Sequence, residues 1–276
     1  MKNKTAIVIV TYNPEISNIQ KVLKELCNYR IFVYDNNSRN SAKLKELVSH
    51  FVNVNLFLSK SNKGIATAQN EAIKKIMNDN KEKYIFFLDQ DSFITDEELF
   101  KLEKNMIYLQ NKHKKIGVLA ASTDNLNNQA VKFEYLNEVI SSGMLIPISV
   151  LSSVGLMKEK FFIDMVDYEW CWRAENKGYS VIKDNSIKFY HQIGTKNRIL
   201  RKIPIAPFRL YYVFRNTIYM LNTNYLPHNY GFKLRFGLFK QIIFNLVFCS
   251  NRVQRVKYII KGIEDGKKRK LGQLDE

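Results

Sequence analysis

Short apolar runs alternate with segments of helical periodicity over the first third of the chain. Residues 5–11, 30–34, 52–58 and 84–88 are apolar runs that predict buried strands. Between these runs apolar residues recur at spacings of three and four, most clearly over residues 66–77. This alternation predicts a parallel sheet with helical crossovers, and hence an α/β fold.

The pattern loosens after residue 91. Residues 96–111 are expected to form a helix and residues 116–121 a strand, whereas residues 131–147 suggest strands with no helix between them. We therefore expect the sheet to become mixed there. A chain of 276 residues is long enough for one large domain with an appendage. We place the boundary near residue 196.

Polar residues follow three of the apolar runs, at residues 11–14, 35–38 and 89–92. The carboxyl ends of parallel strands share one edge of a sheet, where ligands bind in open α/β folds. Asp89 and Asp91 lie one residue apart, so strand alternation would let both carboxylates point the same way. The two carboxylates repel each other unless a cation lies between them. Their oxygen atoms suit Mg²⁺ or Mn²⁺, which could also bind the phosphates of a substrate. A solvated acidic turn is the alternative interpretation.

Two common nucleotide motifs are missing from the chain. It has no G-x-G-x-x-G after the first strand and no G-x-x-x-x-G-K-[ST]. These absences argue against a nicotinamide or flavin cofactor and against a P-loop nucleotidase. Asp35, at the end of the second strand, is placed to accept hydrogen bonds from a ribose or a base. The remaining hypothesis is a nucleotide-diphosphate site whose charge is met by a metal.

The net charge of +17 is concentrated in the last third of the chain. From Lys196 onward there are seventeen Lys and Arg but four acids, a net charge of +13. Such a surface attracts polyanions, which could be nucleic acid or anionic lipid. Cys27, Cys171 and Cys249 form no C-x-x-C motif, as expected in a reducing cytoplasm. No secretory signal is expected, because the first strand follows the N-terminus directly.

One segment of the basic region has the pattern of an amphipathic helix. Its apolar residues recur every three or four positions, at Phe232, Phe236, Phe239, Ile243 and Leu246. The longest uncharged stretch, residues 241–251, is far short of the roughly 20 residues that span a bilayer. We interpret the amphipathic segment as a helix that lies in the membrane interface. Residues 267–270, Lys-Lys-Arg-Lys, would add electrostatic attraction to the lipid surface. The alternative is a helix packed on the catalytic domain.

Several segments together resemble family 2 inverting glycosyltransferases of the GT-A fold. They are Ile7-Val8-Ile9-Val10-Thr11-Tyr12-Asn13-Pro14, Tyr34-Asp35-Asn36-Asn37-Ser38, Asn62-Lys63-Gly64-Ile65-Ala66 with Asn70, and Leu88-Asp89-Gln90-Asp91-Ser92. Residues 161–174, Gly178-Tyr179 and residues 191–194 resemble the rhamnosyltransferase branch, and residues 211–216 are similar to a segment of bacterial rhamnosyltransferases. The resemblance implies a GT-A catalytic domain over residues 1–196, with a nucleotide half (1–91) and an acceptor half (92–196). Residues 197–276 are then a helical basic extension.

The resemblance also implies roles for individual residues. The nucleotide site would consist of Thr11, Tyr12, Asn13, Asp35, Asn62, Gly64 and Asp89. Asp91 and Asp89 would hold the metal, with His191 near the metal or the diphosphate. Asp167 matches the general base on the acceptor hydroxyl, and Glu169, Asp164 and Trp170 would position the acceptor. Many relatives have Glu where this chain has Val166, so Asp164 and Glu169 stay open as alternative bases.

The residues themselves leave structural alternatives beside these roles. Apolar surroundings supplied by Trp170 and Trp172 would raise the pKa of Asp167 toward the value that a base needs. Alternatively, the acids at positions 164, 167 and 169 merely cap a helix over residues 167–176. His191 could equally be a core histidine bonded to the backbone.

We therefore expect an inverting, Mg²⁺- or Mn²⁺-dependent glycosyltransferase. By resemblance it transfers L-rhamnose from dTDP-L-rhamnose to a polyprenyl-diphosphate-linked saccharide, for surface polysaccharide synthesis at the inner face of the cell membrane. A UDP-hexose donor is the alternative on the same scaffold. A nucleic-acid-binding protein acting through the basic tail is the alternative of another class, although no nucleic-acid partner is expected.

Overall fold

The computed structural model of the protein describes residues 4–112, 115–123, 131–191 and 204–274. Its main sheet has eight strands in the order β3-β2-β1-β4-β8-β6-β9-β7. They span Thr5–Thr11 (β1), Arg30–Asp35 (β2), Val54–Leu58 (β3), Tyr84–Asp89 (β4), Ile116–Ser122 (β6), Phe133–Leu136 (β7), Met144–Pro147 (β8) and Ser180–Lys188 (β9). Two short strands, β5 (Ser92–Phe93) and β10 (Tyr190–His191), pair with each other.

The strand directions confirm a mostly parallel sheet that becomes mixed. Strands β1, β2, β3 and β4 are parallel to one another, and β6 is parallel to β9. Strand β8 runs antiparallel to β4 and β6, and β7 runs antiparallel to β9. Both β7 and β8 come from residues 131–147, where strands without an intervening helix are predicted.

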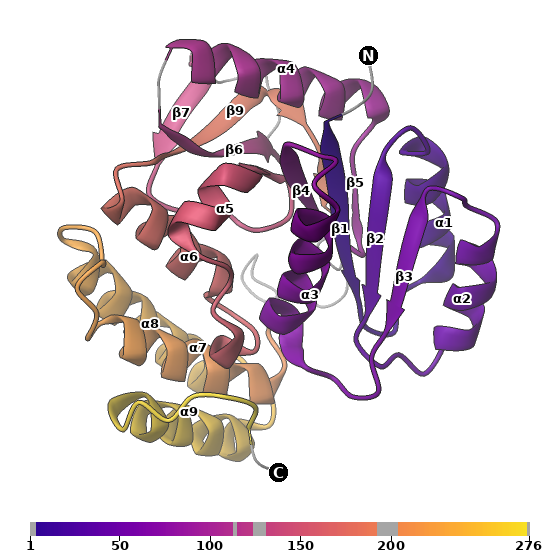
Figure 1. Ribbon diagram of the computed structural model, residues 1–276. Coiled ribbons are helices and arrows are strands. Elements are labelled where there is room, and N and C mark those ends of the chain that lie inside the picture. Colours follow the sequence, from indigo (N-terminus) through magenta and orange to yellow (C-terminus); the bar gives the residue numbers. More distant parts are fainter. Residues whose placement is uncertain (1–3, 113–114, 124–130, 192–203, 275–276) are drawn as a thin grey trace.

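Helices cover both faces of the sheet, which makes three layers. The core on one face includes residues of α1 (Ile16–Glu25), α2 (Ser41–Ser49) and α4 (Asp96–Lys112). The core on the other face includes residues of α3 (Gly64–Asp79), α5 (Ile148–Val154) and α6 (Val166–Asn176), which stand in front of the sheet in Figure 1.

The buried run before Asp89 shows how the sequence produces these layers. Strand β4 is buried from Tyr84 to Leu88. Its side chains alternate between the two cores, with Phe86 in one and Phe87 in the other. Because a central strand is covered on both sides, both sets of alternate positions are apolar.

Some element boundaries differ from the sequence-based expectations. The third strand begins at Val54, where pairing with Ile31 begins, and not at residue 52, since Val52 is fully exposed. Helix α6 begins one residue before the expected start. Helix α5 and strand β9 were not predicted. Strand β9 carries Lys183, Asp184 and Asn185 in its middle, which hides its apolar pattern.

The described part of the basic C-terminal region forms three helices, which lie below α6 in Figure 1. They are α7 (Pro207–Met220), α8 (Tyr230–Val247) and α9 (Arg252–Lys267). Helices α7 and α9 approach closely at Gly262 and Gly266, where a Cβ would lie 2.6 Å from Tyr211 O and 2.8 Å from Arg215 O. The expected boundary near residue 196 falls outside the described residues. Within the described ranges, no helix has the length and apolar character needed to cross a bilayer.

Candidate active site

Three polar segments meet at one edge of the sheet, as the sequence predicts. In the parallel register Thr11 of β1 lies opposite Asp35 of β2, and Val10 lies opposite Asp89 of β4. The segments that follow these strands therefore share the carboxyl edge, where open α/β sheets bind ligands.

Asp35 is buried beneath this edge and is 1% exposed. Its Oδ1 accepts hydrogen bonds from Thr11 Oγ1 at 2.9 Å and from Ser38 Oγ, and its Oδ2 accepts one from Ser38 N at 2.9 Å. The Asp35 carboxylate thus holds two loops together from beneath and offers a ligand almost no exposed surface.

Gln90 joins the loop after β1 (residues 11–14) to the acidic turn after β4 (residues 89–92). Tyr12 N donates to Gln90 Oε1 at 2.7 Å, and Gln90 Nε2 donates to Tyr12 O at 3.3 Å. Asn13 has a φ of 50° and donates from its backbone N to Ser38 Oγ at 2.7 Å. The backbone of Tyr12 is thereby held at this edge, and its side chain is half exposed.

The Asn62–Gly64 segment also belongs to this edge. Asn62 Oδ1 accepts from Gly64 N at 3.0 Å, and the buried Asn36 accepts from Lys63 N at 2.7 Å. Gly64 has a φ of +79°, and a Cβ there would lie 2.5 Å from Phe162 O. In this structure the lack of a Cβ makes room for Phe162.

The acidic turn is joined by hydrogen bonds to Ser142, in the turn that precedes β8. Strand β4 ends at Asp89, so Asp91 lies in a turn and strand alternation does not set its direction. Asp89 N donates to Ser142 Oγ at 3.0 Å, and the buried Ser142 donates to Ser92 Oγ at 2.9 Å.

The metal-binding capacity of this turn rests on two carboxylates. Asp89 and Asp91 are both partly exposed at the sheet edge. Among the residues that the structure describes, no three His, Cys, Asp or Glu gather closely enough to enclose a metal ion. One or two carboxylates with open positions fit Mg²⁺ or Mn²⁺ held jointly with substrate phosphates. They do not fit a closed protein cage.

Asp167 is a partly buried carboxylate in the first turn of α6. It accepts from Ser141 N at 3.1 Å and from Tyr168 N at 3.0 Å. Burial raises the pKa of Asp167 to about 6 although these N–H groups oppose the rise, and the negative charge of Asp89 adds to it. A carboxylate with this pKa can take a proton near neutral pH.

Asp164 is held in an ion pair by the C-terminal region. Arg209 of α7 donates from Nε to Asp164 Oδ2 at 3.2 Å and from Nη2 to Oδ1. Burial opposes the change, but the bond to Asp164 and the charges of Asp164 and Asp89 raise the pKa of Arg209. The first turn of α7 therefore lies within electrostatic reach of the acidic edge.

Two of the residues expected to position an acceptor lie in the protein interior. Glu169 has no exposed surface, and its carboxylate accepts from Arg173 Nε at 2.9 Å and Tyr225 Oη at 2.9 Å. Trp170 is also fully buried and donates to Gly155 O at 2.7 Å. Neither side chain reaches an acceptor in this arrangement. Among the predicted acids around α6, Asp167 remains the candidate base.

The backbone of His191 pairs with Ser92, directly after the acidic turn. This places the residue beside the turn, in keeping with the sequence-based proposal. The rest of that motif, residues 192–194, lies outside the described residues.

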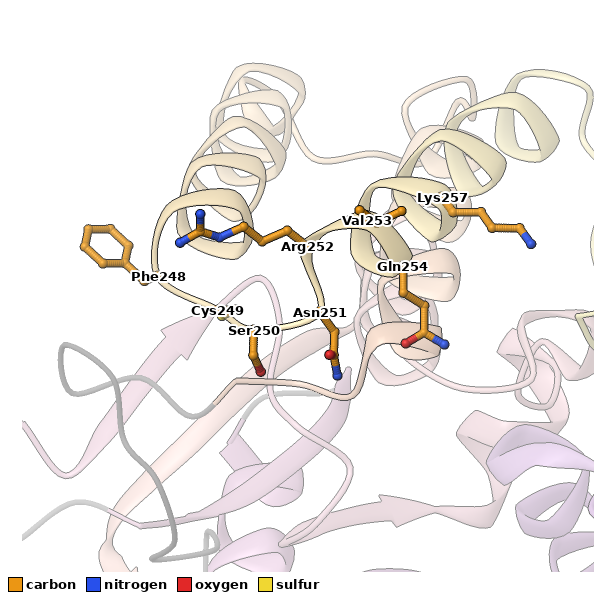
Figure 2. A pocket seen from close by; sticks show the side chains of 8 residues that line it. All are labelled: Phe248, Cys249, Ser250, Asn251, Arg252, Val253, Gln254 and Lys257. Carbon is orange, nitrogen blue, oxygen red and sulfur yellow. The ribbon is translucent and has the colours of Figure 1, made fainter.

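A separate, shallow pocket of about 790 Å³ lies at the turn between α8 and α9 (Figure 2). It is lined by Phe248, Cys249, Ser250, Asn251, Arg252, Val253, Gln254 and Lys257. None of these residues belongs to the acidic edge, and we assign the pocket no part in the chemistry there.

Comparison with known proteins supports the family assignment. A family model described as glycosyl transferase family 2 matches residues 6–135. The dTDP-rhamnosyl transferase RfbF of Shigella flexneri is 33% identical over 290 residues, which cover 96% of each protein. The chain belongs to glycosyl transferase family 2. It is a glycosyltransferase, as the sequence motifs predict.

Solved structures confirm the GT-A fold of this glycosyltransferase. The mannosyltransferase PcManGT of Pyrobaculum calidifontis, solved with GDP-Man and Mn²⁺, has a TM-score of 0.63 at 11% identity. The alignment covers 99% of this chain and 77% of that one. TarS 1–349 of S. aureus with UDP-GlcNAc has a TM-score of 0.59 at 17% identity, covering 94% and 81% of the two chains.

Sequence reasoning assigned no role to several residues at the site of this enzyme. Gln90 and Ser142 bond to neighbouring loops, and Arg209 reaches Asp164 from a distant helix. Gln90 could have been noticed because it lies between the two acids. Arg209 gave no local signal, because its partner is 45 residues away.

Proposed function

We propose that this family 2 enzyme transfers L-rhamnose, with inversion, from dTDP-L-rhamnose to a hydroxyl of a lipid-linked saccharide. The donor assignment is supported by the relative RfbF, which is similar along nearly its whole length. The single observation that carries the catalytic part is Asp167, a partly buried carboxylate whose pKa of about 6 suits a base at the ligand-binding edge.

In the proposed reaction Asp167 takes the proton of the acceptor hydroxyl. The oxygen attacks the anomeric carbon while the bond from that carbon to the diphosphate oxygen breaks, and dTDP leaves with the electron pair. Attack from the face opposite the leaving group inverts the anomeric centre. The N–H groups of Ser141 and Tyr168 fix the carboxylate, and burial keeps it basic enough for the task.

The donor would lie along the edge formed by Thr11, Tyr12, Asn13, Asn62 and Gly64. Asp35 supports this edge from beneath by tying Thr11 to Ser38. Asp91 and Asp89 would hold Mg²⁺ or Mn²⁺, which supplies positive charge to the departing diphosphate. We propose that Asp164 holds Arg209 near the departing diphosphate through their ion pair.

A thermal-shift experiment with dTDP, UDP and GDP, each with and without Mn²⁺, tests the donor class. A nucleotide at 100 times its Kd stabilises the folded state by about 2.7 kcal/mol. We expect a Mn²⁺-dependent rise in Tm that is largest with dTDP, followed by release of dTDP from dTDP-rhamnose. A larger shift with UDP would transfer the proposal to a UDP-hexose. No shift with any nucleotide, in folded protein, would refute the proposal.

The exposed face of α8 would attach the enzyme to the inner leaflet, where a polyprenyl-diphosphate-linked acceptor is presented. Helix α8 packs inward through Leu238 and Phe244, whereas Phe232, Phe236 and Phe239 are 76, 45 and 56% exposed. The exposed lysines and arginines of the C-terminal region add electrostatic attraction to anionic lipid.

Vesicle sedimentation tests this attachment. We expect the wild type to bind phosphatidylglycerol vesicles more strongly than phosphatidylcholine vesicles, and less at high salt. Changing Phe232, Phe236 and Phe239 together to Ser should abolish binding, whereas Phe100→Ser on α4 should not. Salt-sensitive binding to a DNA or RNA duplex that survives the triple change would instead favour a nucleic-acid partner.

A further inference from the structure

The segment that leads into α6, residues 161–165, has an unusual backbone. It begins at the end of a 3-10 turn at Glu159–Phe161, and Phe162, Asp164 and Met165 have φ values of 65, 65 and 64°. Residues other than glycine seldom adopt positive φ, and such conformations persist where the surrounding structure enforces them. Asp167 comes two residues after this segment, so the segment sets where the candidate base lies.

Asn216 of α7 binds this segment along its length. The side chain is fully buried, and its Nδ2 donates to Phe161 O at 3.2 Å, Ile163 O at 3.0 Å and Asp164 O at 2.8 Å. One amide group thus contacts three carbonyl groups of the segment. Only the NH₂ end of the amide can serve these acceptors, which fixes its orientation.

Arg215 supports the same arrangement. Its Nε donates to Asn216 Oδ1 at 2.9 Å, which holds the amide in that orientation. Its Nη2 donates to Phe161 O at 2.9 Å, and its Nη1 donates to Gly272 O in the segment that follows α9. The guanidinium is fully buried, and its carbon lies 5.1 Å and 5.0 Å from the ring centroids of Tyr211 and Tyr212.

The segment also contacts the donor edge. Ile65 N donates to Phe162 O at 2.7 Å, and Gly64 leaves room for that carbonyl. The carbonyl groups held by α7 therefore lie between the start of α3, on the nucleotide side, and the start of α6, which carries Asp167.

We propose that Asn216 and Arg215 are positioning residues that fix the segment before α6, and through it the Asp167 carboxylate relative to the donor. The proposal rests on the proposed role of Asp167 as the base. It makes α7 and the segment that follows α9 part of the catalytic architecture, beyond any role in membrane attachment. A displacement of about 1 Å at a reacting group can lower a rate about 100-fold.

The test compares two isosteric substitutions at buried asparagines. Asn216→Asp keeps the acceptor for Arg215 but removes the NH₂ that serves the three carbonyl groups. Asn245→Asp on α8 is the matched control. Asn245 is 1% exposed, donates to Gln241 O at 2.8 Å and accepts from Arg255 Nη1 at 2.6 Å. Each change removes one buried donor group and preserves an arginine contact within the C-terminal helices, but only the first faces the segment.

The assay measures dTDP released from dTDP-rhamnose with Mn²⁺ and a panel of octyl β-glycosides as acceptors, or with water as acceptor where none reacts. Rates are divided by the folded fraction from circular dichroism. We expect Asn216→Asp to lower kcat about 10- to 100-fold with donor KM changed less than about threefold. Asn245→Asp should keep kcat within about twofold of wild type. If Asn216→Asp does not fold, Asn216→Ala and Asn245→Ala are compared by the same criterion.

Equal kcat values for the two variants would overturn the positioning role, as would a loss that appears only in KM. Asp167→Asn separates this failure from failure of the proposed function. If Asp167→Asn retains wild-type turnover, the base assignment is wrong whatever the asparagine variants do. If it is inactive while the asparagine variants match, only the positioning role is wrong.

Discussion

The partly buried Asp167 carboxylate should make the protein less stable at neutral pH, so Asp167→Asn should stabilise it. The pKa rises from 3.8 to about 6 on folding, and about two units at 1.36 kcal/mol each amount to about 3 kcal/mol. The amide can accept only one of the N–H bonds from Ser141 and Tyr168, which costs about 1 kcal/mol. We expect a net gain of about 2 kcal/mol at pH 7.5.

The sign of the pH dependence follows from the direction of the shift. Because folding raises the pKa of Asp167, protonation favours the folded wild type below about pH 4, and this contribution disappears as the pH rises through about 6. The advantage of Asp167→Asn should therefore shrink to near zero at pH 4.5. Turnover should be lost at every pH.

The assay is thermal unfolding at pH 7.5 and pH 4.5, with EDTA and without nucleotide, so that no bound cation changes the charge near Asp167. At about 2 °C per kcal/mol, Tm should rise by about 4 °C at pH 7.5. Asp164→Asn is the control, because losing the ion pair with Arg209 should lower stability by up to about 1 kcal/mol. A less stable Asp167→Asn, or a gain that is equal at both pH values, would refute the reasoning.

Three further predictions follow from individual contacts. Initial rates between pH 5 and 8 should show kcat/KM rising about tenfold per unit below about pH 6 and levelling above it, and Asp167→Asn should lose about 10²- to 10⁴-fold in kcat. Glu169→Gln should lower the free energy of unfolding measured in urea by about 3 kcal/mol, because Arg173 loses a buried charged partner. The kcat per folded molecule should stay within about threefold of wild type. A large loss of kcat would instead support a role for Glu169 in positioning the acceptor. Gly64→Ala should lower stability by at least about 2 kcal/mol, because it combines positive φ with a clash at Phe162 O, and an unchanged urea midpoint would contradict this.

The exposed face of α8 illustrates what a periodic pattern leaves open. The spacing of Phe232, Phe236, Phe239, Ile243 and Leu246 predicts one apolar side of a helix, and the helix is present, with the first four exposed and Leu246 partly buried. The same pattern fits a helix packed on the domain and a helix facing lipid. The tertiary structure buries Leu238 and Phe244 and leaves the predicted stripe at the surface.

The sequence alone specifies the alternation of strands and helices over residues 5–89. Runs such as residues 84–88 are apolar at every position, which specifies strands covered on both faces, and polar residues after three parallel strands must meet at one edge. Only the tertiary structure separated Asp167 from Glu169. Two positions along a helix turn the side chain by about 200°, so one acid lies near the edge and the other in the core with Arg173. It alone also brought Asn216 to Asp164, because that contact depends on how α7 packs and leaves no local pattern in the chain.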